Sequence, residues 1–187
     1  MSLREYKRKR TFETTPEPKD RKRTAKTLRF VVQQHRASSP HYDFRLEMGG
    51  VLKSWAVPKG PSLDPSVKRL AIQVEDHPFS YRSFEGTIPS GNYGAGDVIV
   101  WDEGTYSPMD FNGKSKNKAD KQLREELQEE KIKFSLEGKK LKGDFALVKT
   151  RARGENTWLL MKLKDEYATT EDILEKDRSV VSGKKVQ

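Results

Sequence analysis

The stretch His41-Tyr42-Asp43-Phe44-Arg45-Leu46-Glu47-Met48 sets the folding pattern of the chain, because its residue types alternate strictly. Charged or ligand-forming side chains occupy the odd positions, and large apolar side chains occupy the even positions. Side chains in a β-strand point to opposite faces with a period of two, so the stretch predicts a strand with one apolar face. We expect that face to anchor the strand in the core and to hold the imidazole, carboxylate and guanidinium of the other face rigidly.

The sequence on either side predicts further short strands. An apolar run over residues 30–35 ends at His35, and Gly49-Gly50 predicts a turn before a strand over residues 51–57. Other strands are predicted over residues 69–77, 98–101, 132–136, 141–149 and 157–164. About eight short strands with few helices predict a mainly β protein that forms a compact β-barrel.

Two segments outside the strands predict flanking helices. In residues 114–131 the apolar residues Ala119, Leu123 and Leu127 are spaced by four, which predicts a helix on the outside of the barrel. Residues 170–177 predict a second, short helix. We therefore expect one or two helices beside the barrel.

Three local patterns refine this expectation. In residues 69–77, Leu70, Ile72 and Val74 predict an apolar strand face, with the other face carrying Ala71, Gln73, Glu75 and His77. Asp102-Glu103-Gly104 predicts a hairpin turn. The glycine-rich residues 86–96 predict a barrel corner, because no Lys-Ser/Thr pair and no helix follow them, as a phosphate-binding loop would require.

The composition favours a polyanionic partner. The 187 residues include 37 Lys and Arg against 28 Asp and Glu, a net charge of +9, so nucleic acid is the first expected partner and an anionic membrane surface the second. With no cysteine in the chain, a metal must be bound by His, Asp or Glu. Since no apolar run approaches the ~20 residues of a membrane span and no secretory signal is present, we expect an intracellular, cytoplasmic protein, associated with the nucleoid in a prokaryote.

The charge distribution divides the chain into two parts. Residues 1–27 contain a dense basic run and few large apolar residues, which predicts an N-terminal arm that is largely disordered when the protein is free and that orders on a phosphate backbone. Residues 28–187 are predicted to form a single barrel domain.

The histidines point to a metal site. His35, His41 and Asp43 form a set of two imidazoles and one carboxylate, which leaves coordination positions open for water and substrate and suits Mn²⁺, Zn²⁺ or Fe²⁺. Arg45 can clamp phosphate oxygens, and His77 can donate to an oxygen or protonate a leaving alkoxide. Together these groups favour phosphoryl transfer over acyl transfer. The plainer interpretations are an ion pair of Arg45 with a neighbouring carboxylate and a hydrogen bond of His77 to Glu75.

The motifs resemble one family, the 3′-phosphoesterase module of bacterial DNA ligase D and its free-standing relatives. The resembling pieces run in order along nearly the whole chain: Tyr6-Lys-Arg-Lys-Arg-Thr-Phe12, Thr15-Pro-Glu-Pro18, Phe30-Val-Val-Gln-Gln-His35, His41-Tyr-Asp-Phe-Arg-Leu-Glu47, Lys53-Ser-Trp-Ala-Val-Pro-Lys-Gly-Pro-Ser62, Val74-Glu-Asp-His-Pro78, Phe84-Glu-Gly-Thr-Ile-Pro89, Gly91-Asn-Tyr-Gly-Ala-Gly96, Val98-Ile-Val-Trp-Asp102 and Trp158-Leu-Leu-Met-Lys162.

The resemblance implies a Mn²⁺-dependent enzyme, with Zn²⁺ or Co²⁺ as alternative metals, acting on DNA primer-template 3′ ends. It implies removal of a 3′-terminal ribonucleoside and then of the 3′-phosphate, leaving a 3′-hydroxyl for non-homologous end joining. The implied metal ligands are His35, His41 and Asp43, with Arg45 and His77 on the scissile phosphate. The implied supporting residues are Tyr81, Lys59, Arg69, Glu75, Arg10 and Glu17. The implied partners are ligase and polymerase modules and Ku, for a monomeric protein.

One position departs from the family pattern. The family arm carries Arg-Asp-Phe, whereas this chain has Arg10-Thr11-Phe12. The missing carboxylate puts the contribution of the arm to the nuclease-like step in question and leaves the metal site unchanged.

Two other functions compete with a phosphoesterase. A non-haem Fe(II) oxygenase would use His41, Asp43 and His77 as a facial triad, although that interpretation gives the basic charge no role. A catalytically silent nucleic-acid-binding barrel would need the charge alone.

Overall fold

The computed structural model describes residues 2–19 and 26–187. Nine strands are present in this part of the chain: β1 (Arg29–Arg36), β2 (His41–Met48), β3 (Val51–Val57), β4 (Arg69–Pro78), β5 (Gly86–Ile88), β6 (Gly96–Pro108), β7 (Lys131–Gly138), β8 (Lys142–Lys149) and β9 (Thr157–Lys162). The helical elements are α1 (Leu3–Arg8), α2 (Lys116–Gln128) and the 3₁₀ helices η1 (Phe79–Ser83) and η2 (Ile173–Glu175).

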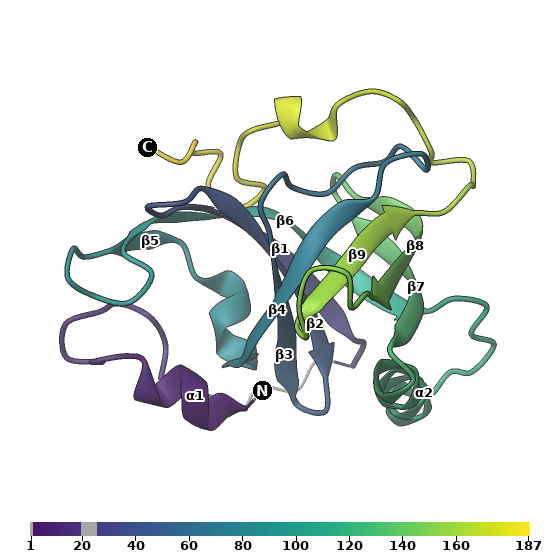
Figure 1. Ribbon diagram of the computed structural model, residues 1–187, viewed down its shortest axis with the longest axis horizontal. Helices are drawn as coiled ribbons and strands as arrows, with labels where there is room; N and C mark the ends of the chain where they lie inside the picture. The colour runs from purple at the N-terminus through teal and green to yellow at the C-terminus, as the bar shows by residue number, and fades with distance from the viewer. Residues whose placement is uncertain (1, 20–25) are drawn as a thin grey trace.

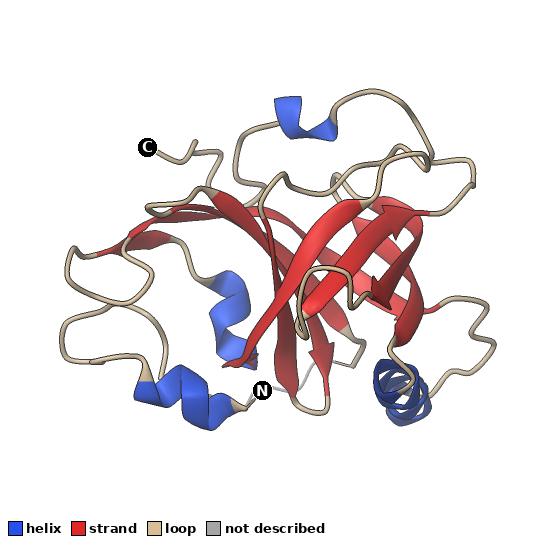
Figure 2. Ribbon diagram, in the orientation of Figure 1, coloured by secondary structure: helices blue, strands red, loops and turns tan. Residues whose placement is uncertain are grey.

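Eight of these strands close into an antiparallel barrel, which confirms the predicted fold class (Figures 1 and 2). The strand order is β1-β2-β3-β4-β9-β8-β7-β6, and pairing of β1 with β6 closes the sheet. Strand β5 extends the edge of β6. Helix α1 packs on β4, while α2 packs on β6 and β7 at the other side of the molecule (Figure 1).

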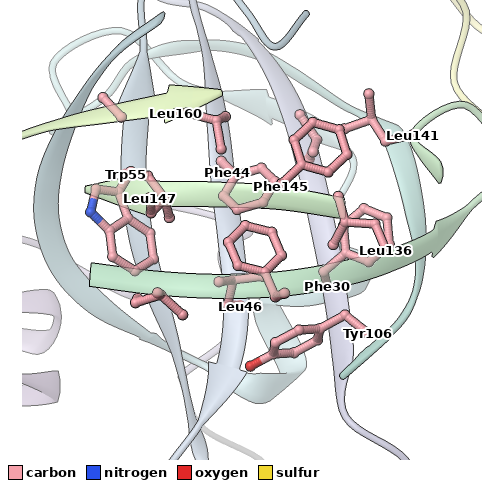
Figure 3. Packing of buried hydrophobic residues seen from close by; sticks show 14 of the residues in the cluster. Phe30, Phe44, Leu46, Trp55, Tyr106, Leu136, Leu141, Phe145, Leu147 and Leu160 are labelled. Atoms are coloured by element: carbon pink, nitrogen blue, oxygen red, sulfur yellow. The ribbon is translucent and has the colours of Figure 1, made fainter. Parts of the chain in front are cut away.

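The apolar face of β2 points into the barrel, as its alternation predicts. Phe44 and Leu46 are fully buried in the main core (Figure 3). Met48 is also fully buried there, and the ring centroids of Phe44 and Phe134 lie 5.9 Å apart. Tyr42 lies at the end of this row against Trp101. Since alternate side chains of a strand point to opposite faces, Asp43 and Arg45 lie on the outside of the barrel.

The outer face that carries the polar side chains is sheltered. A second, smaller apolar cluster covers it and draws on the arm, on η1 and on β3, β5 and β6; its buried members are Tyr6, Leu52, Phe79, Tyr81, Phe84, Ile88 and Val98. Arg45 is only 2% exposed beneath this cover. The site groups therefore lie between the barrel wall and a cap of side chains.

The alternation predicted for residues 69–77 holds as far as Val74 and fails at His77, and its apolar side does not face the barrel core. Ala71 is buried in the barrel core, whereas Ile72 is 40% exposed. Strand β4 carries one extra residue between the pairs Leu52–His77 and Ser54–Val74, which is a β-bulge. Directly paired residues lie on the same face, so the bulge brings His77 onto the outer face with Val74.

The predicted hairpin turn at Asp102-Glu103-Gly104 is also wrong, because β6 continues through it. The Asp102 carboxylate accepts hydrogen bonds from three backbone N–H groups of the β7–β8 turn, residues 139–141. A Cβ at Gly104 would lie 2.0 Å from the carbonyl oxygen of Glu137, so glycine serves close strand approach here.

The helix predicted over residues 114–131 is confirmed as α2, and Ser115 caps it by accepting from the Lys118 N–H. Of the helices in the described part of the chain, none combines the length and apolar character needed to cross a bilayer. Residues 2–19 of the predicted arm lie against the barrel, and residues 20–25 fall outside the described residues. The disorder of the arm in the free protein stays a prediction.

Candidate active site

Two neighbouring strands bring the three predicted metal ligands together. His35 at the end of β1 pairs directly with His41 at the start of β2, and Asp43 is two residues further along the same face. One ligand atom from each residue lies within 4.8 Å of the others. Asp43 Oδ2 is 3.7 Å from His35 Nδ1, and Asp43 Oδ1 is 3.4 Å from His41 Nε2.

Backbone carbonyls determine which nitrogen of each imidazole is free. His35 Nε2 donates to the Gly94 carbonyl at 2.8 Å, and His41 Nδ1 donates to the Ser39 carbonyl at 2.7 Å. The other nitrogens therefore turn their lone pairs towards the Asp43 carboxylate. A divalent cation placed among these three atoms could be bound by all of them, and imidazoles oriented in this way are typical of metal ligands. The donor set fits a divalent metal.

The charges in this group support one another. Burial alone would raise the pKa of Asp43, but Arg45 and the two histidines outweigh it and hold that pKa well below its ordinary value. Burial acts to lower the pKa of His41, but the hydrogen bond and charge of Asp43 raise it above its ordinary value. Asp43 is therefore ionised at neutral pH, as a metal ligand must be.

Arg45 presents one unpaired donor beside the triad. Its Nη2 lies 3.2 Å from Asp43 Oδ2, so the predicted ion pair is present, and its Nε donates to Gln33 Oε1 at 2.8 Å. Its guanidinium carbon lies 5.0 Å from the centre of the Tyr81 ring. The remaining nitrogen, Nη1, is buried without a hydrogen-bond partner. A buried N–H donor without a partner is costly unless an acceptor such as a phosphate oxygen joins it.

His77 reaches the same cavity from β4. Its Nδ1 donates to the backbone carbonyl of Glu75 at 2.9 Å, which confirms a hydrogen bond to that residue, and its Nε2 lies 3.4 Å from Arg10 Nη2. Burial, followed by the charges of Arg45 and Arg10, holds the pKa of His77 well below its ordinary value. The ring is therefore neutral at pH 7, with an acceptor at Nε2.

The arm supplies the far wall. Arg10 Nε pairs with Glu17 at 2.6 Å, its Nη1 lies 3.4 Å from Glu75, and its guanidinium carbon lies 3.9 Å from the centre of the Tyr6 ring. Tyr81 donates its hydroxyl to Glu17 at 2.9 Å. Burial raises the pKa of Tyr81 well above its ordinary value, so the phenol keeps its proton.

These groups surround a cavity of about 310 Å³. Its lining residues are Arg10, His35, Ala37, Ser38, His41, Asp43, Arg45, Ala56, Val74, Glu75, His77, Tyr81, Ile88, Tyr93 and Gly94. Lys59, which is exposed after β3, and Arg69 at the start of β4 are not among them. The supporting roles of these two residues stay predictions. Glu47 accepts from the Arg29 N–H and pairs with Lys116 at 2.6 Å, a structural arrangement.

Sequence reasoning missed three residues of the site. Gln33 holds Arg45, Gly94 holds His35, and Tyr93 lines the cavity from the loop between β5 and β6. Gln33 shares the parity of His35 in the same strand, so extending the alternation of β1 backwards would have found it. Nothing in the local pattern of residues 86–96 places that loop beside His35, which lies more than fifty positions earlier.

Comparison with known proteins identifies the family of the chain. The sequence model of the family described as the DNA Ligase D 3′-phosphoesterase domain matches residues 33–149. The protein of Pseudomonas aeruginosa named multifunctional non-homologous end joining protein LigD is 53% identical over 174 residues, which cover 91% of this chain and 19% of that protein.

More distant relatives carry the same name. The LigD protein of Mycobacterium bovis is 43% identical over 88% of this chain and 20% of its own length, and that of Mycolicibacterium smegmatis is 40% identical over 88% of this chain and 21% of its own length. The chain thus spans about a fifth of the length of these relatives. On the strength of the family match and the 53% identity, the chain belongs to the DNA ligase D 3′-phosphoesterase domain family.

Proposed function

We propose that this protein is a metal-dependent phosphoesterase that heals DNA 3′ ends. It removes a 3′-terminal ribonucleoside in a phosphodiesterase step and then the 3′-phosphate in a phosphomonoesterase step, leaving a 3′-hydroxyl for repair synthesis and ligation. The observation that carries the proposal is the unpaired Nη1 donor of Arg45, buried beside a donor set that fits a divalent metal.

His35, His41 and Asp43 would hold the cation, which we propose to be Mn²⁺. A divalent cation held there supplies Lewis-acid polarisation of a phosphoryl oxygen. Arg45 binds a second oxygen through Nη1, while Asp43 and Gln33 fix the guanidinium through its other two nitrogens. Because this orientation exists before substrate arrives, little reorganisation is needed as charge develops on the phosphate.

His77 and Tyr81 complete the contacts on the phosphate. In the free site His77 keeps its proton at Nδ1 for the Glu75 carbonyl and leaves Nε2 as an acceptor. Burial, followed by the charges of Arg45 and Arg10, depresses the pKa of His77. A bound phosphate anion would offset those two charges and raise this pKa, so that Nε2 would take a proton from solvent and give it to the leaving alkoxide as water attacks the phosphorus. Lys59, Arg69, Glu75, Arg10 and Glu17 are proposed to support the site.

The DNA substrate, the partners, the domain organisation and the oligomeric state are also proposed. The net charge of +9 supports binding of a DNA primer-template, and the relatives are named for non-homologous end joining. We propose that ligase and polymerase modules and Ku act on the same ends, that residues 28–187 form one domain with residues 1–27 as its arm, and that the protein acts as a cytoplasmic monomer.

The proposal is tested with a labelled primer-template whose primer ends in one ribonucleotide, incubated with several divalent metals. We expect Mn²⁺ to stimulate loss of the ribonucleoside, followed by loss of the 3′-phosphate. Asp43→Asn and His41→Ala should abolish both steps and Mn²⁺ binding measured by calorimetry. Asp110→Asn is the matched control, because Asp110 is exposed and its positive φ of 58° is one that Asn tolerates.

Each competing function predicts a different experimental result. Full activity in Asp43→Asn would overturn the site assignment. Iron-dependent turnover of 2-oxoglutarate would identify an oxygenase, and salt-sensitive DNA binding with unchanged 3′ ends at every metal would identify a silent binder.

A further inference from the structure

An aromatic ring lies at the rim of the cavity without a role in the reaction described above. Tyr93 is 51% exposed and lines the cavity, together with the three proposed metal ligands and Arg45. Large hydrophobic side chains with this much exposure are few in the described part of the chain; the others are Ile72, Tyr167 and Val181. Of these four residues, only Tyr93 borders this cavity.

The loop that carries Tyr93 is held in place on both sides. Asn92 donates its N–H to the Pro89 carbonyl at 3.2 Å, and Ala95 donates its N–H to the Asn92 carbonyl at 3.2 Å. The next residue, Gly94, accepts from His35. The backbone of Tyr93 is therefore held close to the proposed metal ligands, because Tyr93 directly precedes Gly94, whose carbonyl orients His35.

Cationic side chains of the arm lie near the ring. Lys9 Nζ lies 4.8 Å and Arg10 Cζ lies 5.7 Å from the ring centre, and Thr14 hydrogen-bonds Asn92 at 2.8 Å. Figure 1 shows the arm and the loop between β5 and β6 side by side at the same edge of the molecule. The buried side chains of Arg10 and Tyr81 line the same cavity.

The cavity also meets the surface beside the β1–β2 connection. There the β1–β2 connection supplies Ala37 and Ser38 to the lining, and residues 38–40 are exposed. This exposed connection offers a DNA strand whose last phosphodiester lies at Arg45 a surface along which to continue upstream. With the upstream strand placed there, the exposed ring of Tyr93 is available to the nucleoside beyond the scissile phosphate.

We propose that Tyr93 is a stacking platform for the nucleobase of the 3′-terminal nucleotide, which leaves in the phosphodiesterase step. The inference rests on the proposed function. Every base has a flat π-face, so a tyrosine ring supports binding of any terminal nucleotide without selecting its sequence. Stacking of one base on an aromatic side chain corresponds to about 5- to 150-fold in affinity.

The kinetic test compares two primers, one ending in a ribonucleotide and one ending in a ribose without its base. On the base-bearing end, Tyr93→Ala should lower kcat/KM by about 5- to 150-fold, mainly through KM. Tyr93→Phe keeps the ring and should behave as the unaltered protein. Removing the base should weaken the unaltered protein to the level of Tyr93→Ala. Tyr167→Ala is the matched control, because Tyr167 is 44% exposed and borders a different cavity.

A binding experiment separates this inference from the proposed function. A primer ending in 2-aminopurine riboside is titrated with protein in EDTA, so that no cleavage intervenes. Quenching by the unaltered protein and by Tyr93→Phe, lost in Tyr93→Ala, supports stacking even if no metal restores hydrolysis. Equal quenching by all three proteins, or an equal loss of kcat/KM on both primers in Tyr93→Ala, overturns the platform while leaving the phosphoesterase proposal intact.

Discussion

Single backbone carbonyls determine the chemistry of the histidines in this site. The Gly94, Ser39 and Glu75 carbonyls each accept a ring N–H, from His35, His41 and His77 respectively. Each ring therefore presents one defined lone pair to the cavity. At the residue scale, the residue type predicts only that an imidazole is present. The backbone carbonyl that accepts from the ring fixes which of its nitrogens offers a lone pair.

The buried, neutral state of His77 predicts a dependence of stability on pH. Its pKa in the folded protein lies well below the ordinary value of 6.5, so below about pH 6.5 the unfolded chain binds a proton that the folded protein does not. The stabilisation from keeping His77 neutral is fully present above that pH and is lost as pH falls, by at most about 1.4 kcal/mol per pH unit.

The measurement is the free energy of unfolding in urea between pH 5 and 7.5, in EDTA, for the unaltered protein and His77→Asn. The variant keeps an amide N–H for the Glu75 carbonyl and loses the titrating group. We expect a shallower slope in the variant, and parallel curves would contradict the assignment. His35 and His41 remain in both proteins and cancel in the comparison.

At the scale of elements, one amide joins three segments. Gln33 in β1 is fully buried, accepts from Arg45 in β2 and donates to the backbone carbonyls of Tyr81 and Phe84 at 2.9 and 3.1 Å. It thereby couples the orientation of Arg45 to η1, the element that brings Tyr81 to the cavity.

Gln33→Leu should therefore lower both stability and phosphate binding. The change leaves Arg45 Nε buried without its partner, at about 1–3 kcal/mol. It also removes one hydrogen bond from each of the Tyr81 and Phe84 carbonyls, although the Tyr81 carbonyl still accepts from the Phe84 N–H. We expect a lower free energy of unfolding and a raised KM for the 3′-phosphate end. Gln34→Leu is the control, because Gln34 lies on the opposite face of β1 and its Oε1 has no hydrogen-bond partner. Equal effects of the two changes on KM would exclude a positioning role for Gln33.

A substitution in the loop between β5 and β6 should weaken metal binding, although this loop is far from the proposed metal ligands in the sequence. Gly94 has φ of +73°, which alanine adopts poorly, so Gly94→Ala should turn its carbonyl away from His35. We expect Mn²⁺ affinity, measured by calorimetry, to fall by about 10- to 100-fold.

Gly91→Ala is a matched control for this change. Gly91 has φ of +87°, a Cβ there meets nothing within 4 Å, and no hydrogen bond links it to His35. A comparable loss of Mn²⁺ affinity in Gly91→Ala would assign the effect to loop strain alone.

At the scale of the whole molecule, the barrel and the arm are held by different amounts of packing. The barrel has its own closed core, whereas the arm is attached through the buried Tyr6, 4.9 Å from the His77 ring, and through ion pairs to Glu75. Few buried apolar contacts imply a low free energy of local opening. The arm completes the cavity, so its opening would expose the site.

Hydrogen exchange tests this difference. We expect the amides of α1 to exchange faster than those of β2, because β2 is paired on both sides within the barrel. A bound primer-template should slow exchange in α1 as phosphates order the basic arm. Protection of α1 equal to that of β2 in the free protein would contradict the predicted disorder of the arm.

Much of the fold and of the candidate metal-ligand set follows from local alternation. The period of two in residues 41–48 determined which side chains of β2 enter the core, and the pairing of His35 with His41 follows from the strands that flank them. The same reasoning failed in β4, where an extra residue changed the face of His77, and at residues 102–104, where β6 continues. A bulge is set by strand pairing, which local spacing does not record.

The amino-acid sequence by itself determined the mainly β architecture, the basic charge and the set of His35, His41 and Asp43. Only the tertiary structure decided that the site lies on the outside of the barrel, that the arm closes it, and that Gln33, Tyr93 and Gly94 belong to it. The physical reason is the sequence separation over which each signal acts. Alternation reports the two faces of one strand, whereas these contacts join segments up to about eighty positions apart, which only packing brings together.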